Sequence, residues 1–519
     1  MEIVCIGGGP GGLFAALLLK MASPGNNVTV IDRNPRGATY GWGVVFSDET
    51  LLFLDAADGE THRRITEEFV HWEAIDIHFR GQIIRSGGHA FSGLSRRRLL
   101  AILQSRCQDA GVKLRLGEEV GDVSKFEQAD LLIAADGVHS QTRNLHAAVF
   151  QPSVDTHASR YIWLGCHLNL DAFTFVFQDT PSGMFQIHAY PFEPGTSTVI
   201  VECSENTWRS TGLDQATESQ SIEFCQQTFL QFLGGRPLLS NQSSWLNFVT
   251  LRNDTWRSGS TVLLGDAAHT AHFSIGSGTK MAMEDAIVLA DCVGKYGSVP
   301  ESLLAYEQLR EPIVDRTQQA ARDSSLWFEN VNRYRKLPPE QFAFSLLTRS
   351  KRITYQTLAL RDSAFSRTVD RAFMARSGAT APTSSPGLAP LTIRDITFPN
   401  RIVRRLEGEA HTSAFVPAQP GCAGDPDSGC LVTRTLPVSP AGRMTPNSRG
   451  LYEPAECAAW LKLIHSIHRL SPAKVGAVIG HAGPRASSKP NAKGIDLPIT
   501  SGGWETQAAS AIAYGPRSP

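Results

Sequence analysis

The chain has 519 residues and a formal net charge of −1, from 49 basic and 50 acidic side chains. A soluble chain of this length can form two or three domains. The near-neutral balance gives no electrostatic footprint for nucleic acid or for an anionic membrane surface, so we expect neither as a partner.

Cysteine usage and hydropathy narrow the class further. The nine cysteines are scattered and form no C-x-x-C pair, which argues against a zinc site and against a disulfide framework. The apolar run at residues 13–19 is shorter than the roughly 20 residues that span a bilayer, and no basic segment precedes it. Thiols that are kept reduced fit a cytoplasmic protein, which is the localisation we expect.

The chain begins with the pattern of a βαβ unit. Residues 2–6 are predicted as a strand, about 13–22 as a helix and 28–31 as a second strand that closes on Asp32. Further strands are expected at 130–134 and 261–264, each followed by a polar Gly/Asp turn. The sequence therefore starts with a nucleotide-binding type of α/β unit.

The glycine-rich stretch GGGPGG, residues 7–12, satisfies G-x-G-x-x-G directly after the first strand. A lone match is weak, but this context is the one in which the pattern binds dinucleotides, and an ordinary glycine-rich turn explains less. The first glycine allows a tight turn, the second lets backbone approach a pyrophosphate, and the last lets helix pack on strand. An acid after the second strand can accept from ribose hydroxyls. The candidates here are Gly7, Gly9, Gly11, Gly12 and Asp32.

The middle and the end of the chain differ from its start in composition and in the spacing of their apolar residues. Between about 161 and 203 short β-like segments alternate, which predicts a mainly antiparallel sheet inserted in the nucleotide-binding part. Residues 281–373 look helical. A stretch rich in Pro, Ser, Thr and Ala then predicts a linker at 377–390, because this composition buries little apolar surface. The remainder, 391–519, is dense in Pro and Gly.

Two short motifs of one aspartate and one glycine complete a pattern. Asp136-Gly137 ends one predicted strand and Gly265-Asp266 ends another. With GGGPGG they resemble the three motifs of the FAD-dependent aromatic hydroxylases, which have the fold of para-hydroxybenzoate hydroxylase. The resemblance implies an α/β fold with a doubly wound FAD domain of the glutathione-reductase type. The domains it implies are 1–150 with 250–300 for FAD, 151–249 for substrate, and a helical part at 301–376.

The resemblance also implies roles for particular residues. Asp266 would hold the ribityl or ribose part of FAD, and Asp136-Gly137 would lie near the pyrophosphate and the nicotinamide path. Arg96 opens an R-x-x-L-x-x-x-L helix and would approach the FAD phosphates, although an exposed helix face explains it equally well. Gly276 and Gly278 fall where backbone N–H groups can approach the flavin ring and stabilise negative charge on it.

Two histidines in the same loop raise the question of a metal. His269 and His272 are three residues apart, but no third ligand is in view, so we expect no metal. His272 would be close to where flavin and substrate meet, and it is the candidate to orient or deprotonate a phenol. A purely structural histidine is the alternative. Phe273 stands where the family usually has Pro.

A closer resemblance rests on longer words. GWGVVFSDE, RSGGHAFSG, IWLG, STVIVECSE, HFSIGSGTK and WFENVNRY resemble the monooxygenase half of the hydroxylases of salicylyl-CoA and 2-aminobenzoyl-CoA. The likeness covers residues 1–375. Similar words occur in a hydroxylase of a tryptophan derivative in violacein biosynthesis. Arg33, Arg36, Arg96, Arg97 and Arg98 are candidates to meet a CoA phosphate, with a solvated surface as the alternative.

The last part of the chain contains LTI at 391–393, FPNRIV at 398–403, VSPAGR at 438–443 and GHAG at 480–483. With these motifs, residues 391–519 resemble the start of the old-yellow-enzyme-like FMN barrel that follows the linker in the CoA-thioester enzymes. Two departures stand out: Arg404-Arg405-Leu406-Glu407 replaces small flavin-contacting residues, and Val478 replaces a flavin-binding Gln. The segment is also about half of the roughly 250 residues that a barrel takes. We therefore expect a truncated, partly TIM-barrel-like remnant without FMN.

The resemblance implies a reaction. NADH or NADPH would reduce FAD, O2 would give a flavin C4a-hydroperoxide, and an aromatic ring would be hydroxylated para to its donor group. The expected substrate is a salicyloyl- or aminobenzoyl-CoA-type thioester. The alternatives are a hydroxylase of a free aromatic or indole intermediate, a non-hydroxylating flavin dehydrogenase, and a non-catalytic flavin-fold scaffold.

Overall fold

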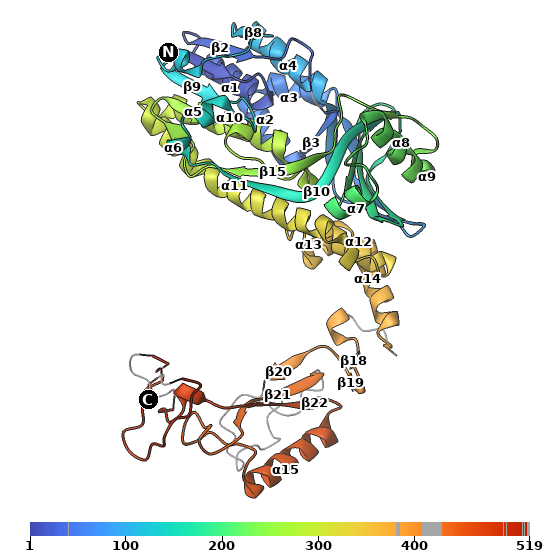
Figure 1. Cartoon of the computed structure of the whole chain (residues 1–519), viewed down its shortest axis with the longest axis vertical. Coiled ribbons are helices and arrows are strands. Elements are labelled where there is room, and N and C mark those ends of the chain that lie inside the picture. Colours follow the sequence, from blue (N-terminus) through green and yellow to red (C-terminus); the bar gives the residue numbers. More distant parts are fainter. Residues whose placement is uncertain are drawn as a thin grey trace. The chain divides into compact units, whose positions relative to one another are not determined.

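A computed structural model describes residues 1–39, 41–379, 385–405, 428–490, 493–494, 496–510, 512 and 514–515. The chain forms two compact units, Met1–Arg367 and Thr368–Pro519 (Figure 1). The first unit thus ends ten residues before the predicted linker. Residues 380–384 of that linker, together with Leu406, Glu407 and Cys422, lie outside the described residues.

A six-stranded sheet forms the nucleotide-binding part of the first unit. Its order is β16-β17-β9-β1-β2-β8, and all pairs are parallel except the edge pair β16–β17. The central strands are mostly apolar because both of their faces are buried. Helices that include α1 cover one face, and the segment around Val123 and Phe126 packs on the other. The bounds are β1 Glu2–Ile6, β2 Asn27–Asp32, β8 Lys113–Leu116, β9 Leu131–Ala134, β16 Arg257–Ser258 and β17 Thr261–Leu263.

Four helices support this sheet. The helix α1 (Pro10–Ala22) packs against α4 (Arg96–Asp109) and α10 (Gly278–Lys295), and α10 packs against the long α11 (Val299–Glu329), as Figure 1 shows. Every residue from Pro10 to Leu19 is buried, which explains why α1 is apolar all round.

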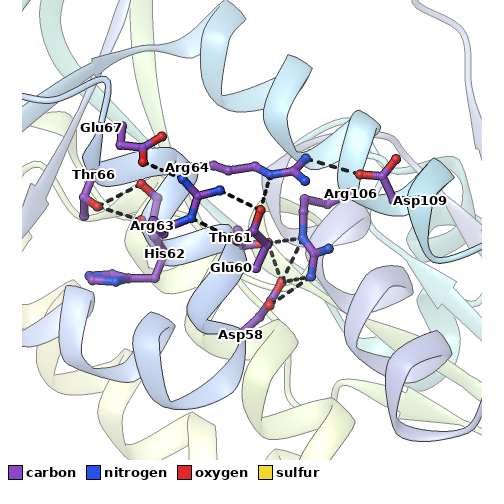
Figure 2. A network of polar contacts seen from close by, with 10 residues as sticks. All are labelled: Asp58, Glu60, Thr61, His62, Arg63, Arg64, Thr66, Glu67, Arg106 and Asp109. Atoms are coloured by element: carbon purple, nitrogen blue, oxygen red, sulfur yellow. Dashed lines mark hydrogen bonds and ion pairs between the residues drawn. The ribbon is translucent and has the colours of Figure 1, made fainter.

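An ion-pair network holds α4 in place (Figure 2). The Arg106 guanidinium on α4 lies 2.8 and 2.9 Å from the two carboxylate oxygens of Asp58, which precedes α3 (Gly59–Thr66). Thr61 also donates to Asp58, and Arg64 reaches Asp109 at 3.2 Å. Because Asp58 and Arg106 are largely buried, this contact fixes the helix that begins with Arg96.

The second sheet is the predicted, mainly antiparallel one. Its order is β14-β10-β13-β12-β11-β5-β6, with β15 also on β10, and only β5–β11 is parallel. The predicted α/β fold with an inserted sheet is therefore confirmed. The bounds are β5 Ala74–Phe79, β6 Gln82–Ser86, β10 Ser153–Cys166, β11 Ala172–Thr180, β12 Gly183–Glu193, β13 Thr196–Cys203, β14 Leu238–Leu239 and β15 Leu246–Arg252.

The pairing of β5 and β6 bears on the domain boundaries, which remain a prediction. β5 and β6 come from residues 74–86, inside the range expected for the FAD domain, yet they pair into the large sheet. A small three-stranded sheet, β3 (Gly43–Ser47), β7 (Phe91–Ser95) and β4 (Val70–Trp72), lies next to them in the chain. The substrate-side sheet therefore draws on two separate stretches of the chain.

The two faces of the large sheet have different partners. Ile162, Leu164, Val199 and Val201 point to one face, where they form a core with residues of the segment that holds α8 (Glu218–Thr228) and α9 (Leu230–Leu233). Because side chains alternate along a strand, the residues between them point to the opposite face. The helices α12 (Pro339–Leu347), α13 (Tyr355–Arg361) and α14 (Ser363–Arg376) follow α11.

The second unit is small. β18 (Leu391–Ile393) and β19 (Ile396–Phe398) form a hairpin. β20 (Val403–Arg405), β21 (Cys430–Pro437) and β22 (Lys474–Gly480) form a parallel sheet, with α15 (Pro454–Leu470) between β21 and β22. A parallel βαβ arrangement is the building unit of a barrel, which closes with eight strands. That this unit is a barrel remnant stays a prediction.

Within the described ranges, no helix is long and apolar enough to cross a membrane.

Candidate active site

A cavity of about 1300 Å³ opens in the first unit at the carboxyl ends of the parallel strands. This is the edge of an open α/β sheet where ligands bind. Twelve of the thirteen predicted site residues line it, whereas His272 is not among the lining residues. The twelve are Gly7, Gly9, Gly11, Gly12, Asp32, Arg96, Asp136, Gly137, Gly265, Asp266, Gly276 and Gly278.

The cavity has two ends of different chemistry. We call the part formed by these twelve residues the glycine end. We call the other part, formed mainly by ring side chains of the large sheet and its neighbouring loops, the aromatic end. Its rings are Tyr161, Trp163, Phe173, Phe175, His188, Tyr190, Phe248 and Phe273.

The glycines of the first motif serve two purposes. Gly7 has φ +112°, and a Cβ there would lie 2.1 Å from the carbonyl oxygen of Ala135. A Cβ on Gly12 would lie 2.2 Å from the carbonyl oxygen of Gly7. A Cβ on Gly9 would meet no atom within 4 Å. Gly7 and Gly12 are thus required by internal packing, while Gly9 presents bare backbone to the cavity.

Two helices begin at the glycine end without a side-chain cap. The helix α1 starts after Gly9 with Pro10, and α10 starts at Gly278, where an added Cβ would again meet nothing within 4 Å. Uncapped first-turn N–H groups and the positive end of the helix dipole favour a negatively charged ligand. The glycine end is therefore suited to bind an anion at two places.

Arg96 and Asp266 face each other across this end. The Arg96 guanidinium forms no hydrogen bond with any part of the chain that the structure describes. Burial lowers the pKa of Arg96, and Asp266 opposes that shift. The Asp266 side chain is exposed to the cavity, yet desolvation by the surrounding walls raises its pKa against the charge of Arg96. Both groups are thus free to bind a polar ligand.

The Asp136-Gly137 loop is tied to the other motifs. Asp136 accepts from the backbone N–H of Gln141 at 2.8 Å, and its second oxygen is buried without a partner among the described residues. Arg143 donates to the carbonyl oxygens of Val138 (2.6 Å) and Ala267 (3.0 Å), which joins this loop to the Gly265-Asp266 loop. Arg143 was not among the predicted site residues, although it lies only six residues after Gly137 in the stretch ADGVHSQTR, residues 135–143.

His269 supports the loop through a contact within the protein. Its Nε2 lies 2.8 Å from Asp285 Oδ2, and Asp285 also accepts from Gly265 N–H at 3.2 Å and from Arg310 Nε at 2.7 Å. Burial alone would raise the pKa of Asp285, but the charges of His269 and Arg310 hold it below its ordinary value. The described residues contain no group of three or more potential metal ligands.

The position of His272 does not suit its predicted role as the group that contacts a phenol. Its Nδ1 accepts from the Ser274 N–H at 3.3 Å, and its ring stacks on His157 and Phe273. Burial lowers the pKa of His272 well below its ordinary value, and the neighbouring His157 adds to the shift. His272 thus shapes the loop from the inside.

Strand periodicity builds the wall of the aromatic end. His188 on β12 is paired with Phe175 on β11 and with Ile200 on β13, and Trp163 on β10 is paired with Ile200 from the other side. Paired residues point to the same face of a sheet. Four neighbouring strands thus contribute side chains to one surface, opposite the face that packs on α8 and α9.

A buried polar pair lies within this wall. His188 Nε2 is 2.9 Å from Glu202 Oε2, and the two side chains are 2% and 0% exposed. A carboxylate only accepts, so Nε2 then carries the hydrogen and Nδ1 keeps a lone pair, which has no partner among the described residues. Burial lowers the pKa of His188, and Glu202 opposes the shift. His188 thus lines the cavity, and its Nδ1 is a neutral potential acceptor that is buried without a partner among the described residues.

Arg349 completes the aromatic end, and burial lowers its pKa to about 10. Its guanidinium lies over the rings of Phe175 and Phe328, at 5.2 and 5.0 Å from their centroids. Arg349, His188 and Glu202 were not among the predicted site residues. The available signal was Glu202, an acid inside the otherwise apolar stretch VIVEC of residues 199–203, because a buried strand carries such a group only with a partner.

Comparison with known proteins identifies the family. The chain matches a family model described as an FAD binding domain over residues 98–321, and one described as lycopene cyclase protein over residues 2–172. It is 40% identical over 438 residues to a salicyloyl-CoA 5-hydroxylase of Streptomyces sp, a match that covers 82% of this chain and 84% of that protein. The chain belongs to the FAD-dependent aromatic monooxygenases. The predicted enzyme class and FAD as cofactor are confirmed.

One further relative agrees with this assignment, and one solved structure shares the fold. The monooxygenase is 34% identical over 366 residues to 3-hydroxy-4-methyl-anthranilyl-[aryl-carrier protein] 5-monooxygenase of Streptosporangium sibiricum, over 70% of this chain and 98% of that protein. The tetrameric form of 2-methyl-3-hydroxypyridine-5-carboxylic acid oxygenase has a similar fold, with TM-score 0.55 and 19% identity over 67% of this chain and 95% of that chain.

The glycine end fits the cofactor of this family. Gly9 leaves open space beside an uncapped helix N-terminus, which suits a pyrophosphate, and the unpaired Arg96 suits a phosphate as well. Gly278 begins α10, and its backbone is likewise uncovered at an uncapped helix N-terminus, which suits an electron-rich ring edge. The exact contacts of each residue with FAD remain predictions.

The match with salicyloyl-CoA 5-hydroxylase also reaches the second unit. It covers 82% of the chain, whereas residues 1–376 make up only 72% of it (376 of 519). At least part of residues 377–519 is therefore shared with that relative.

Proposed function

We propose that this monooxygenase hydroxylates an aromatic acyl thioester of the salicyloyl- or aminobenzoyl-CoA type, para to an ortho hydroxyl or amino group, with NADH or NADPH as reductant. The observation that carries the proposal is the single cavity in which the glycine end and the aromatic end are continuous. A flat substrate held at the aromatic wall would lie beside the flavin ring, as the chemistry requires. The 40% identity to a salicyloyl-CoA 5-hydroxylase supports the choice of substrate.

The ring donor follows from the chemistry of the reaction. Bound FAD supplies an electrophilic oxygen, and a thioester carbonyl withdraws electrons from the ring that must accept it. An ortho hydroxyl or amino group offsets that withdrawal most strongly at the positions ortho and para to itself. For a salicyloyl thioester the para position is C5.

The residues of this chain would orient the ring and handle its proton. We assign His188 Nδ1 to accept a hydrogen bond from the ring donor once the substrate is bound, because Nε2 is held by Glu202 and the buried Nδ1 has no protein partner in the described part of the chain. Rings such as Phe175 and Tyr190 would exclude water around it. This assignment replaces the earlier expectation for His272.

Turnover of matched substrates tests the proposal. The FAD-loaded enzyme is given NADH or NADPH and O2 with salicyloyl-CoA, anthraniloyl-CoA, the two free acids or tryptophan. We expect substrate-stimulated NAD(P)H oxidation and formation of 2,5-dihydroxybenzoyl-CoA from salicyloyl-CoA. A clear preference for a free acid or an indole would favour the second candidate, a hydroxylase of a free aromatic intermediate. Reductant consumption without any hydroxylated product would favour a flavin dehydrogenase.

A further inference from the structure

The charged residues that line the cavity are of both signs up to residue 266 and only basic after it. Arg352 and Arg361 are exposed, so they lie where the cavity meets solvent. The acidic residues are Asp32, Glu118, Glu119, Asp136 and Asp266, and the later basic ones are Lys280, Arg349, Arg352 and Arg361.

Among the described residues, Arg352 and Arg361 have no partner for their charges. Arg352 lies in the loop between α12 and α13, and Arg361 is the last residue of α13. Neither guanidinium forms a hydrogen bond or an ion pair within the part of the chain that the structure covers. The adjacent Asp362 accepts instead from backbone N–H groups, of Gly87 at 2.7 Å and of Phe365 at 2.8 Å.

The sequence stretch RSGGHAFSG, residues 85–93, forms part of this edge of the cavity. The flavin site does not account for it. RSGGHAFSG contains Gly88, which has φ +68° and where a Cβ would lie 2.4 Å from the carbonyl oxygen of Arg361. The next residue, His89, lines the cavity. Burial lowers the pKa of His89 to about 4, and the charge of Arg361 contributes, which places that charge near the loop. Gly88 thus lets the loop pack closely against the end of α13.

We propose that Arg352 and Arg361 bind the phosphate of a pantetheine thioester whose aromatic end occupies the cavity. The inference rests on the proposed function and adds a location for the arm of the substrate. With the ring at the aromatic wall, the flexible arm runs outward and carries its phosphate to the edge of the cavity. The same phosphopantetheine chemistry is offered by CoA and by an aryl-carrier protein.

The chemistry of an arginine side chain suits a phosphate. A guanidinium binds phosphate through paired, charge-assisted hydrogen bonds. Because the contact is remote from the reacting ring, its loss should raise KM with little effect on kcat. Because both side chains are exposed, added salt should weaken the contact.

The test compares substrates with and without phosphate on the FAD-loaded full chain. The double variant Arg352→Ala/Arg361→Ala is assayed with salicyloyl-CoA, with the phosphate-free salicyloyl-pantetheine, and with a salicyloyl-loaded carrier protein. We expect KM for salicyloyl-CoA to rise roughly tenfold or more, with the loss confined to phosphate-bearing substrates. Arg352→Lys/Arg361→Lys should recover part of it. Arg316→Ala, an exposed arginine outside the cavity lining, is the matched control.

The outcomes separate this inference from the proposed function. If the wild-type enzyme hydroxylates both thioesters but the double variant loses nothing, or loses equally on salicyloyl-pantetheine, the arginine site is wrong and the proposed function stands. If the wild-type enzyme hydroxylates no thioester, both are wrong. A KM increase with salicyloyl-CoA alone supports CoA as the source of the phosphate, and one with the carrier protein alone supports the carrier.

Discussion

The two ends of the cavity are built in different ways. At the glycine end, bare main chain forms much of the surface beside the side chains of Arg96 and Asp266, and this main chain comes from short contiguous stretches: residues 7–12, 136–137, 265–266 and 276–278. At the aromatic end, side chains form the surface, and they come from alternate positions of four strands. The difference indicates that one end is specified by local conformation and the other by strand register.

This contrast has a consequence for function. Backbone that approaches a ligand serves any chain with the same cofactor, so the glycine end is expected to be common to the family. Register-dependent side chains can change one at a time, and a shift of a strand by one residue would turn His188 to the opposite face. The aromatic end is therefore where relatives with different substrates can differ.

The largest expected effect comes from a side chain placed in the open space at Gly9, which tests the glycine end alone. The Gly9 φ of −72° and ψ of 174° suit any residue, and no atom of the described residues would lie within 4 Å of the new Cβ. We expect Gly9→Val to weaken FAD binding roughly a thousandfold, because the side chain occupies the place of the pyrophosphate. Fluorescence titration of the apoprotein with FAD measures this.

The control for that variant is Gly12→Val. A Cβ at Gly12 would overlap the carbonyl oxygen of Gly7, so this change should lower the free energy of unfolding of the apoprotein itself. Gly9→Val should leave it near the wild-type value. Normal FAD affinity in Gly9→Val would show that the cofactor does not approach this backbone.

A second variant addresses the aromatic end alone. His188→Gln removes the proposed acceptor while FAD binding should stay unchanged, and kcat with salicyloyl-CoA should fall about a hundredfold. Because burial lowers the pKa of His188, the wild-type residue stays neutral at pH 7 and is protonated only at lower pH. The acid limb of kcat should therefore lie below pH 6.5 and disappear in the variant. An unchanged pH profile would exclude this role.

The third variant concerns Asp266. Its side chain is exposed to the cavity and desolvation raises its pKa, so it contributes no stabilising contact to the apoprotein. Asp266→Ala should raise the Kd for FAD about 10- to 100-fold, the effect of losing a hydrogen bond to a charged group. Asp266→Asn should lose less, since an amide oxygen still accepts. Full flavin content in purified Asp266→Ala would contradict the assignment.

The smallest expected effect is on stability in acid. The pKa of buried His89 is about 4 in the folded protein, below its ordinary value of 6.5. The unfolded chain therefore binds more protons below pH 6.5, and stability falls as the pH drops from 6.5 toward 4. His89→Gln should reduce the loss between pH 7 and pH 5 by about 1–2 kcal/mol, measured by urea unfolding. The same change at exposed His139 should leave the slope as it is.

How far the sequence could predict the site follows from this contrast. The strand at 2–6, the motif glycines and the Asp–Gly turns were predicted correctly as elements because each depends on a few neighbouring residues. His188, Glu202 and Arg349 were not found, because β12, β13 and the α12–α13 loop come together only in the folded chain. His272 looked functional because its loop is, yet its side chain packs inward.

The most direct test of the two-ended cavity is a crystal structure of the FAD-loaded enzyme with salicyloyl-CoA. The account predicts the pyrophosphate beside Gly9 and the first turn of α1, and the flavin ring beside Gly276 and Gly278. It further predicts the salicyl ring on the aromatic wall, with its hydroxyl in hydrogen-bond contact with His188. FAD bound away from the glycine end, or a salicyl ring held away from β12, would contradict it.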